Sequence, residues 1–400
     1  MISVNEKRFS DNFFALAKIG WTETGLNRPS YSPAYLEGRE LVKKLMEDAG
    51  MAVRIDSVGN IFGRYEGTDP ARGTVITGSH LDSVPNGGVY DGALGVVAGI
   101  EAARSVHEQL GSLPAALEVV GFVAEEASPL GGTFGSRAIT GLAPLDQPPA
   151  AFEWSGLNRE ALERARVNTK DYEAYLELHI EQGPVLERKN IDIGIPTGIV
   201  SIIRYKVTMT GQQNHAGTTP MGERLNAVRG LSEFIAAWCA WADGRLAQSD
   251  DFVYNTGVIA ADPNSPAVVP GKASVVVELR SLTDAIDAEL VARLHELVKD
   301  PAFAAYSPAI EKVVSKAPVA LQERAISAVE QAAGLCGLSC QRMPSGASHD
   351  AVAMAHFMDT GMIFVKSRDG ISHNKAEHTA EEDMHKGLRT LAEALTILAR

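Results

Sequence analysis

Hydrophobic residues form two short continuous runs in the first third of the chain. The runs GTVITGSH (residues 73–80) and LEVVGFVAEE (117–126) are rich in β-branched residues, which is typical of strands buried on both faces. Between them, ALGVVAGIEAARSVHEQL (93–110) has the apolar spacing of a helix. This order predicts a βαβ unit with a parallel sheet, and functional residues gather at the carboxyl ends of such strands.

The pattern changes near residue 195. Segments 205–212, 252–261 and 273–282 alternate between apolar and polar residues, as half-exposed antiparallel strands do. Helical spacing in 225–244 and 283–300 separates these strands, and after residue 308 helical spacing returns before a short buried strand at 361–367. We therefore predict an α/β domain in two parts, 1–194 and 308–400, interrupted by a smaller α+β domain at 195–307.

Composition and charge narrow the classes of partner. Of the 400 residues, 45% are hydrophobic and 22% charged, as in an ordinary globular protein, and the formal net charge is −13. Such an acidic chain has no basic stripe for nucleic acid. No apolar run approaches the roughly 18 residues that a membrane span needs, and the N-terminus lacks the apolar core of a signal peptide. With only three cysteines, we expect a cytoplasmic protein without nucleic-acid or membrane partners.

Five side chains at strand ends or in loops have metal-binding chemistry: His80, Asp91, Glu126, His179 and His373. Imidazoles and carboxylates are the usual ligands of zinc, manganese and cobalt. A carboxylate such as Asp91 can bridge two ions about 3.5–4 Å apart, and such pairs serve the hydrolysis of amides and esters. Each residue alone could be an ordinary polar group, so the prediction depends on their occurring together.

Glu125 directly precedes the candidate ligand Glu126. Adjacent residues at the end of a strand point to opposite sides, so Glu126 could bind metal while Glu125 reaches a metal-bound water. A bound water has its pKa lowered to about 7, and a nearby carboxylate can take its proton. The alternative for two adjacent glutamates is a solvent-exposed turn, which the preceding apolar run VVGFVA disfavours.

Longer motifs give a specific resemblance. In chain order they are GSHLDSV, GGVYDGALGV, AEEASPLGGTFGSRAITG, LELHIEQGPVLE, GQQNHAGTTPM, PSGASHDA and GISHNKAEHT. The chain resembles the amidase/hydantoinase–carbamoylase branch of the M20 metallopeptidase-like family, which includes N-carbamoyl-L-amino acid hydrolases, allantoate amidohydrolases, ureidoglycolate amidohydrolases and β-ureidopropionases. The resemblance implies a mixed-sheet dinuclear-metal catalytic domain with an inserted α+β lid and dimerisation domain.

The resemblance also implies roles for residues near the metals. Two divalent ions per subunit (Zn²⁺, or Mn²⁺, Co²⁺ or Ni²⁺) would be bound, with Asp91 as the bridge. Glu125 matches the general base, and Asp82 matches the aspartate that orients a metal-bound histidine. The residues that match the family's metal ligands are His80, Asp91, Glu126, His179 and His373.

Other matches concern the substrate. His215 matches a histidine that polarises the scissile carbonyl across a homodimer interface, a kind of donor that is worth about 3–4 kcal/mol of the barrier. Gln182 matches a substrate contact, and Arg280 matches an arginine that clamps a carboxylate with two parallel donors. Gly346 is a further candidate contact.

One position departs from the family pattern. Ala267, in PNSPAVVPG, stands where the family commonly has an asparagine, and Asn264 is a candidate substitute. A methyl group neither donates nor accepts a hydrogen bond, so we expect one polar contact with the substrate to be missing.

The expected function is hydrolysis of a carbamoyl or ureido C–N bond of a small carboxylate, such as an N-carbamoyl-L-amino acid or an allantoate-like compound. Two alternatives remain open. An N-acyl-amino acid hydrolase or a dipeptidase-like aminoacylase would use the same metals with a different pocket. A catalytically inactive binding protein would normally have lost a ligand or the base, and this chain retains both.

Overall fold

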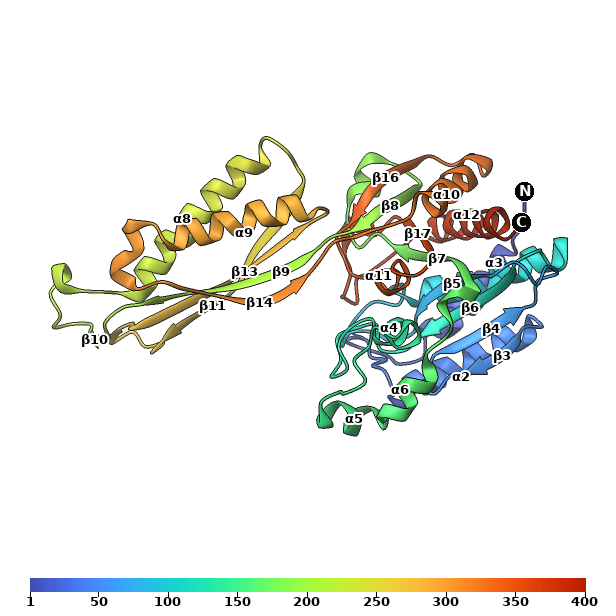
Figure 1. Ribbon diagram of the computed structural model, residues 1–400, viewed down its shortest axis with the longest axis horizontal. Coiled ribbons are helices and arrows are strands. Elements are labelled where there is room, and N and C mark those ends of the chain that lie inside the picture. Colours follow the sequence, from blue (N-terminus) through green and yellow to red (C-terminus); the bar gives the residue numbers. More distant parts are fainter. The chain divides into compact units, whose positions relative to one another are not determined.

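The computed structural model describes residues 1–400, which form two compact units (Figure 1). The larger unit comprises Met1–Ile199 and Ala320–Arg400, and the smaller unit comprises Val200–Val319. These boundaries differ from those expected at residues 195 and 307. The difference at the second boundary arises because β14 (Ala309–Lys316), which the hydrophobic pattern did not indicate, pairs with the sheet of the smaller unit.

The larger unit is built on a nine-stranded mixed sheet in which four neighbouring strands, β17, β7, β5 and β6, are parallel. Strand β4 pairs antiparallel with β6, and β16 pairs with β8 outside the main order. Along the sheet the order is β15 (Val319–Ala320), β8 (Ile193–Ile199), β17 (Asp359–Val365), β7 (Tyr172–Ile180), β5 (Thr74–His80), β6 (Ala116–Phe122), β4 (Ile61–Tyr65) and β3 (Ala52–Ile55), with β16 at Cys340–Ser345.

The predicted βαβ unit is confirmed as β5, α3 (Ala93–Leu110) and β6, and most of α3 is buried. Helix α3 packs against the central strands and against the C-terminal helix α12 (Glu381–Ala399) (Figure 1). Three acidic residues in the first turn of α12 interact favourably with its helix dipole. The other helices are α1 (Glu6–Ala17), α2 (Pro33–Asp48), α4 (Phe134–Thr140), α5 (Pro149–Ser155), α6 (Arg159–Ala165), α7 (Val185–Lys189), α10 (Glu323–Leu335) and α11 (Ala351–Met354), and β1 (Trp21–Thr22) pairs with β2 (Gly25–Leu26).

One strand prediction was too long. Strand β6 ends at Phe122 rather than at Glu126, and Ala124 has a left-handed conformation with φ of 53°. The chain therefore turns before the two glutamates. Glu125 and Glu126 lie in a loop, and strand alternation does not determine where their side chains point.

The smaller unit has a four-stranded antiparallel sheet in the order β11 (Phe252–Asp262), β13 (Lys272–Ser281), β9 (Ile202–Thr210) and β14. Helices α8 (Ala227–Leu246) and α9 (Asp284–Val298) pack on this sheet. The predicted alternation is confirmed in β13, whose buried residues are Ala273, Val275, Val277, Leu279 and Ser281. A separate two-stranded ribbon joins β10 (Asn214–His215) to β12 (Val268–Val269).

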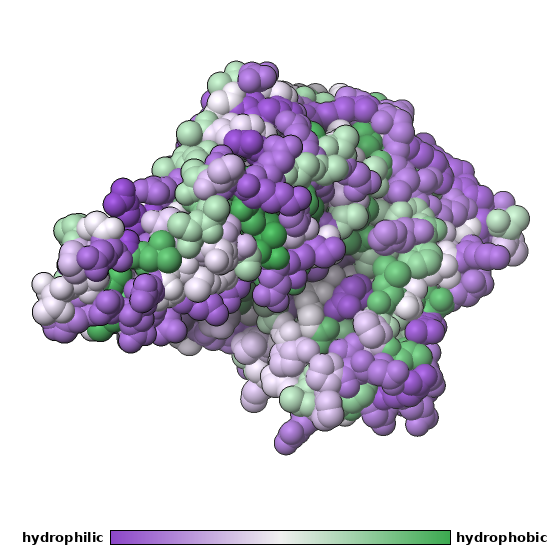
Figure 2. Space-filling view, turned by 60° about the vertical axis from the view of Figure 1, so that its left-hand side comes forward, coloured by the Kyte–Doolittle hydropathy of each residue, from purple (hydrophilic) through white to green (hydrophobic).

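The surface is consistent with the composition. Figure 2 shows a face on which hydrophilic residues predominate and hydrophobic residues occur between them in small groups. None of the helices combines the length and the apolar character that crossing a membrane requires.

Candidate metal centre

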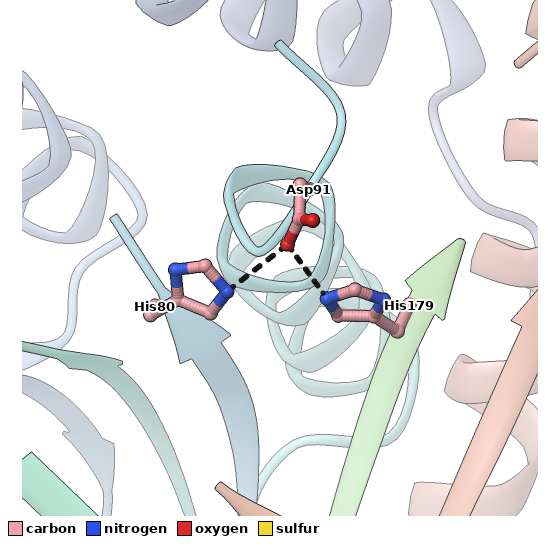
Figure 3. Close-up of side chains that lie close together, drawn as sticks. All are labelled: His80, Asp91 and His179. Carbon is pink, nitrogen blue, oxygen red and sulfur yellow. Dashed lines mark hydrogen bonds and ion pairs between the residues drawn. The ribbon is translucent and has the colours of Figure 1, made fainter. Parts of the chain in front are cut away.

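Three buried side chains meet at the carboxyl edge of the central sheet (Figure 3). His80 is the last residue of β5, His179 is the last but one of β7, and Asp91 lies two residues before the start of α3. The Oδ1 atom of Asp91 lies 3.2 Å from Nε2 of His80 and 3.1 Å from Nε2 of His179. Parallel strands bring their carboxyl ends to one edge of a sheet, which is why His80 and His179 become neighbours although they are far apart in the sequence.

The second carboxylate oxygen of Asp91 faces another group of donors. Its Oδ2 atom lies 3.3 Å from Nε2 of His373, and the same imidazole nitrogen is 3.6 Å from Oε1 of Glu126. Donor atoms within each triad, His80–Asp91–His179 and Asp91–Glu126–His373, lie within 4.8 Å of one another. Asp91 is therefore shared by two groups that could each hold a metal ion.

The backbone allows this close approach at two unusual positions. Gly92 has φ of 64°, and a Cβ atom there would lie 2.5 Å from the imidazole of His80. His373 has φ of 54°, a conformation that residues with a side chain rarely adopt. The loop at Asp91 thus requires glycine at position 92. The loop at His373 must be held in its conformation by the residues around it.

Main-chain acceptors orient both buried histidines. The Nδ1 atom of His80 lies 3.0 Å from the carbonyl oxygen of Asp82, and that of His179 lies 2.9 Å from the carbonyl oxygen of Ile180. Each Nδ1–H donates to its carbonyl, which directs Nε2 of each ring towards Asp91. With Nδ1 occupied in this way, Nε2 is the nitrogen available to a metal ion in both rings.

The carboxylate of Asp82 contacts a different part of the site. It lies 3.6 Å from Nδ1 of His80, whereas it accepts the backbone N–H groups of Glu125 and Glu126, each at 3.2 Å. His80 is therefore oriented by the main chain of Asp82. The side chain of Asp82 lies close to the imidazole of His80 and also fixes the loop that carries the two glutamates.

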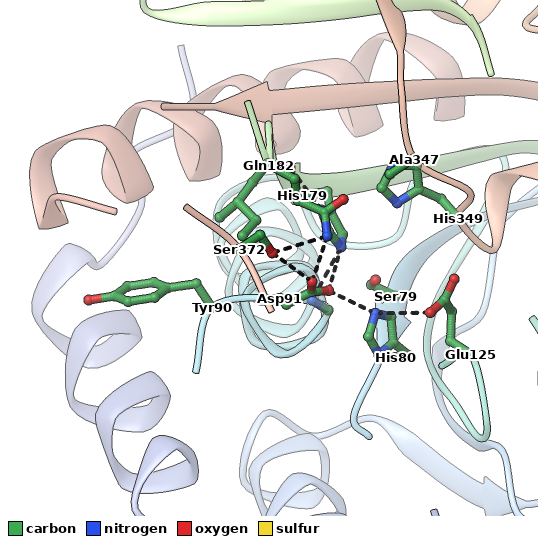
Figure 4. A network of polar contacts seen from close by, with 12 residues as sticks. Ser79, His80, Tyr90, Asp91, Glu125, His179, Gln182, Ala347, His349 and Ser372 are labelled. Atoms are coloured by element: carbon green, nitrogen blue, oxygen red, sulfur yellow. Dashed lines mark hydrogen bonds and ion pairs between the residues drawn. The ribbon is translucent and has the colours of Figure 1, made fainter. Parts of the chain in front are cut away.

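Glu125 is buried, and its Oε2 atom lies 3.6 Å from Nε2 of His80 (Figure 4). Burial raises the pKa of the Glu125 carboxyl well above its usual value, and the negative charges of Asp350 and Glu126 add to this effect, while His80 opposes it. A carboxyl group in this environment can take up and hold a proton, as a general base must.

The charges of the Asp91–Glu126–His373 triad favour the binding of a metal cation. Burial, together with the charge of Asp91, raises the pKa of Glu126 to about 7. A hydrogen bond to Asp91 raises the pKa of His373 to about 9, against the effect of burial. Glu126 Oε1 is also a buried oxygen without a hydrogen-bond partner. These imidazole and carboxylate donors fit a divalent ion such as Zn²⁺, whose charge would offset the buried negative charge.

Polar residues that the sequence analysis did not predict surround the centre. Ser372 lies beside Asp91, and Glu377 accepts two backbone N–H groups at Tyr90 and Asp91. The ring centroid of His349 is 4.5 Å from that of His179. Glu377 lies in the motif GISHNKAEHT and His349 lies in PSGASHDA, two of the motifs that carry the family resemblance. Their presence in these motifs was the only sequence feature that could have indicated a role at the centre.

Gln182, a predicted substrate contact, lies against the proposed ligands. Its Nε2 atom donates to Oδ2 of Asp91 at 2.7 Å, and its Oε1 atom is buried without a partner. The larger unit thus brings together eight predicted site residues: His80, Asp82, Asp91, Glu125, Glu126, His179, Gln182 and His373. Gly346 belongs to the same unit and is exposed just after β16.

His215 and Arg280 belong to the smaller unit, as does Asn264 in the exposed turn before β12. The Nδ1 atom of His215 accepts backbone N–H groups from Gly217 at 3.0 Å and Thr218 at 3.2 Å. Arg280 donates from Nε to Oε1 of Glu278 at 2.9 Å. The structure thus places His215 on the two-stranded ribbon, Arg280 on the four-stranded sheet and Asn264 in the segment between β11 and β12.

Comparison with known proteins tests the family assignment. The model of Peptidase family M20/M25/M40 matches residues 76–397. An N-carbamoyl-L-amino-acid amidohydrolase from Paenarthrobacter aurescens is 34% identical, with 98% of each chain covered. An allantoate amidohydrolase from Bacillus subtilis (strain 168) is also 34% identical, with 96% of this chain and 95% of the relative covered.

A solved structure supports the same family assignment. An amidase of the hydantoinase/carbamoylase family from Burkholderia multivorans has a TM-score of 0.89 and 31% identity, covering 100% of this chain and 98% of that one. The resemblance found in the motifs is therefore confirmed, and the amidohydrolase names of the relatives agree with the predicted enzyme class, hydrolases of non-peptide C–N bonds. The chain belongs to the peptidase family M20/M25/M40.

Proposed function

We propose that this chain is a metal-dependent amidohydrolase that cleaves a carbamoyl or ureido C–N bond of a small carboxylate. The observation that carries this proposal is the shared carboxylate of Asp91, whose two oxygens face separate groups of donors. The relatives named above act, by their names, on N-carbamoyl-L-amino acids and on allantoate. Both compounds combine a ureido-type C–N bond with a carboxylate.

Two divalent ions would bind, one at His80 and His179 and the other at Glu126 and His373, with Asp91 as the bridge. Bound there, they would supply a Lewis acid and a water of lowered pKa. Glu125 lies beside this centre and would take a proton during the reaction and return it to the leaving nitrogen. Asp82 supports this role because it holds the backbone of Glu125.

His215 would act on the substrate carbonyl. Because its Nδ1 atom accepts two backbone N–H groups, the ring hydrogen of the neutral imidazole is on Nε2. The Nε2–H group can therefore donate to the oxygen on which negative charge develops. Both residues of β10, Asn214 and His215, are exposed, so the His215 imidazole is accessible to a substrate or to a second chain.

We further propose a homodimer in which His215 serves the partner's metal centre. Strand β11 is the edge of the small sheet, and its exposed aliphatic residues include Val253 (59% exposed), Val258 (60%) and Ile259 (63%). An exposed apolar edge strand is a ready site for pairing with another chain. The small sheet therefore offers a contact surface for a second copy.

Arg280 would bind the substrate carboxylate. Its bond to Glu278 fixes the plane of the guanidinium group, and a planar guanidinium matches the two oxygens of a carboxylate. Ala267 lies beside His215, because its carbonyl oxygen accepts the N–H of Ala216 at 2.9 Å. The methyl group of Ala267 favours a substrate with an apolar group at that position.

A substrate panel with metal reconstitution tests the reaction class. We expect ammonia to be released from carbamoyl or ureido carboxylates at a higher kcat/KM than amines are released from the matching N-acyl compounds. The measurement is product release with each of Zn²⁺, Mn²⁺, Co²⁺ and Ni²⁺. Faster hydrolysis of the N-acyl series would make the chain an N-acyl-amino acid hydrolase or dipeptidase-like aminoacylase instead.

The two adjacent glutamates should differ in their effects. We expect Glu125→Gln to lower kcat by about 100-fold or more while metal content stays close to that of the wild type, because an amide cannot accept the proton. Glu126→Gln should lower metal content, because it replaces an anionic ligand. Elemental analysis and kcat, measured on the same samples, check both outcomes, and equal effects of the two substitutions would contradict this division of roles.

Subunit mixing tests the role of His215 across the interface. Chains with His215→Ala and chains with Glu125→Gln are each expected to be inactive. A heterodimer of the two has one site with both residues intact, so it should recover about half of the wild-type activity. If subunit exchange is verified and no activity returns, His215 acts on the metal centre of its own chain.

Ala267→Asn tests the departure from the family pattern. We expect it to raise kcat/KM for an N-carbamoyl-L-amino acid by roughly ten- to hundredfold, because an unpaired buried polar group costs about 1–3 kcal/mol. The rate with the preferred substrate should not rise. Ala267→Leu is the matched control, because leucine has the shape of asparagine without its polar atoms, and an unchanged ratio of the two specificities in Ala267→Asn would show that the departure has no effect.

A further inference from the structure

Glu377 connects two segments that are far apart in the sequence. Its side chain is buried in the loop between β17 and α12, and the residue is 5% exposed. Its Oε1 atom accepts the backbone N–H groups of Tyr90 at 3.0 Å and Asp91 at 3.1 Å. Its Oε2 atom accepts the hydroxyl of Ser372 at 2.8 Å. One carboxylate thus holds the segment that carries Asp91 and the segment that carries His373.

We propose that Glu377 is a positioning residue for the second metal ion. It fixes the loop of Asp91 relative to the loop of His373, and it keeps the hydrogen of Ser372 away from the shared carboxylate. This inference rests on the proposed function, in which Asp91 and His373 are metal ligands.

Gly88 leaves the space that the carboxylate of Glu377 occupies. A Cβ atom added to Gly88 would lie 2.1 Å from Oε1 and 2.3 Å from Cδ of Glu377. Such distances are impossible without displacing one of the two segments. Glycine at position 88 therefore allows the carboxylate to reach the backbone N–H groups before α3.

The single hydroxyl hydrogen of Ser372 has two acceptors within reach. Oε2 of Glu377 is 2.8 Å from the hydroxyl oxygen, whereas Oδ2 of Asp91 is 3.3 Å away. The shorter bond is the stronger one, so the hydrogen points to Glu377. The lone pairs of Asp91 Oδ2 then remain available on the side that faces His373.

The loop of His373 depends on such restraints. His373 directly follows Ser372 and has φ of 54°, a conformation that persists where neighbouring contacts determine it. The bond from Ser372 to Glu377 is one such contact. Without it, both the position of His373 and the hydrogen bonding of Asp91 would change.

The proposed test adds Co²⁺ to the metal-free form of the full chain. Calorimetry and visible absorption measure the number of Co²⁺ ions bound and the affinity for each. We expect two Co²⁺ ions per chain for the wild type. In Glu377→Gln the amide NH₂ cannot accept from Ser372, whose hydrogen then turns to Asp91. The second ion should bind at least tenfold more weakly, as typical losses of ligand-orienting partners are 10–100-fold, while the first binds as in the wild type.

A second substitution separates positioning from simple structural support. Ser372→Ala in the Glu377→Gln background removes the competing hydrogen, so we expect it to restore most of the affinity for the second ion. Gly88→Ala should act in the same direction as Glu377→Gln. Asp287→Asn is the matched control, because Asp287 is also a buried carboxylate that accepts two serine hydroxyls, from Ser201 at 2.8 Å and Ser281 at 2.7 Å, but belongs to the smaller unit.

Several results would overturn the proposal. Unchanged affinity for the second ion in Glu377→Gln would do so, as would equal weakening of both ions with a fall in Tm like that of Asp287→Asn. Failure of Ser372→Ala to restore binding would overturn the role assigned to the serine hydrogen. A wild-type protein that binds fewer than two Co²⁺ ions would instead refute the dinuclear centre, and with it the role of Glu377.

Discussion

The burial of one carboxylate, that of Asp91, is the constraint on which the rest of the larger unit depends. An ionised carboxylate away from water is costly unless donors or cations surround it. Here His80 and His179 approach one oxygen, while His373 and Gln182 approach the other. His179 and Gln182 share one segment, so with those of His80, Asp91 and His373 the fold must bring four segments to one point.

The parallel centre of the sheet provides the first part of this arrangement. Strands β5 and β7 lie side by side, and residues at their carboxyl ends put two imidazoles at one edge. Loops provide the remainder, and buried carboxylates fix those loops through backbone N–H groups. Asp82 does this for the loop after β6, and Glu377 does it for the residues before α3. Strands therefore set the position of the centre, and hydrogen bonds to backbone N–H groups set its details.

This division explains how much the sequence could predict. Strands β5 and β6 and helix α3 were predictable, because burial leaves an apolar run or a helical period in the sequence. The predicted length of β6 was wrong, because nothing in the sequence VVGFVAEE shows that the chain turns at Ala124. Strand β14 was missed, since most of its residues are exposed and leave little hydrophobic pattern. The part played by Glu377 was also missed, because a carboxylate that accepts backbone N–H groups has no periodic signal.

The ribbon of β10 and β12 has a consequence for how this enzyme could diversify. Ala267 joins the ribbon through its carbonyl oxygen, which every amino acid possesses, and its side chain is not needed for pairing. Mutations at this position can therefore accumulate without disturbing the main chain that holds His215. With the substrate contact proposed for position 267, natural selection could exchange one preferred substrate for another here while the proposed metal ligands stay the same, so the two properties could evolve separately.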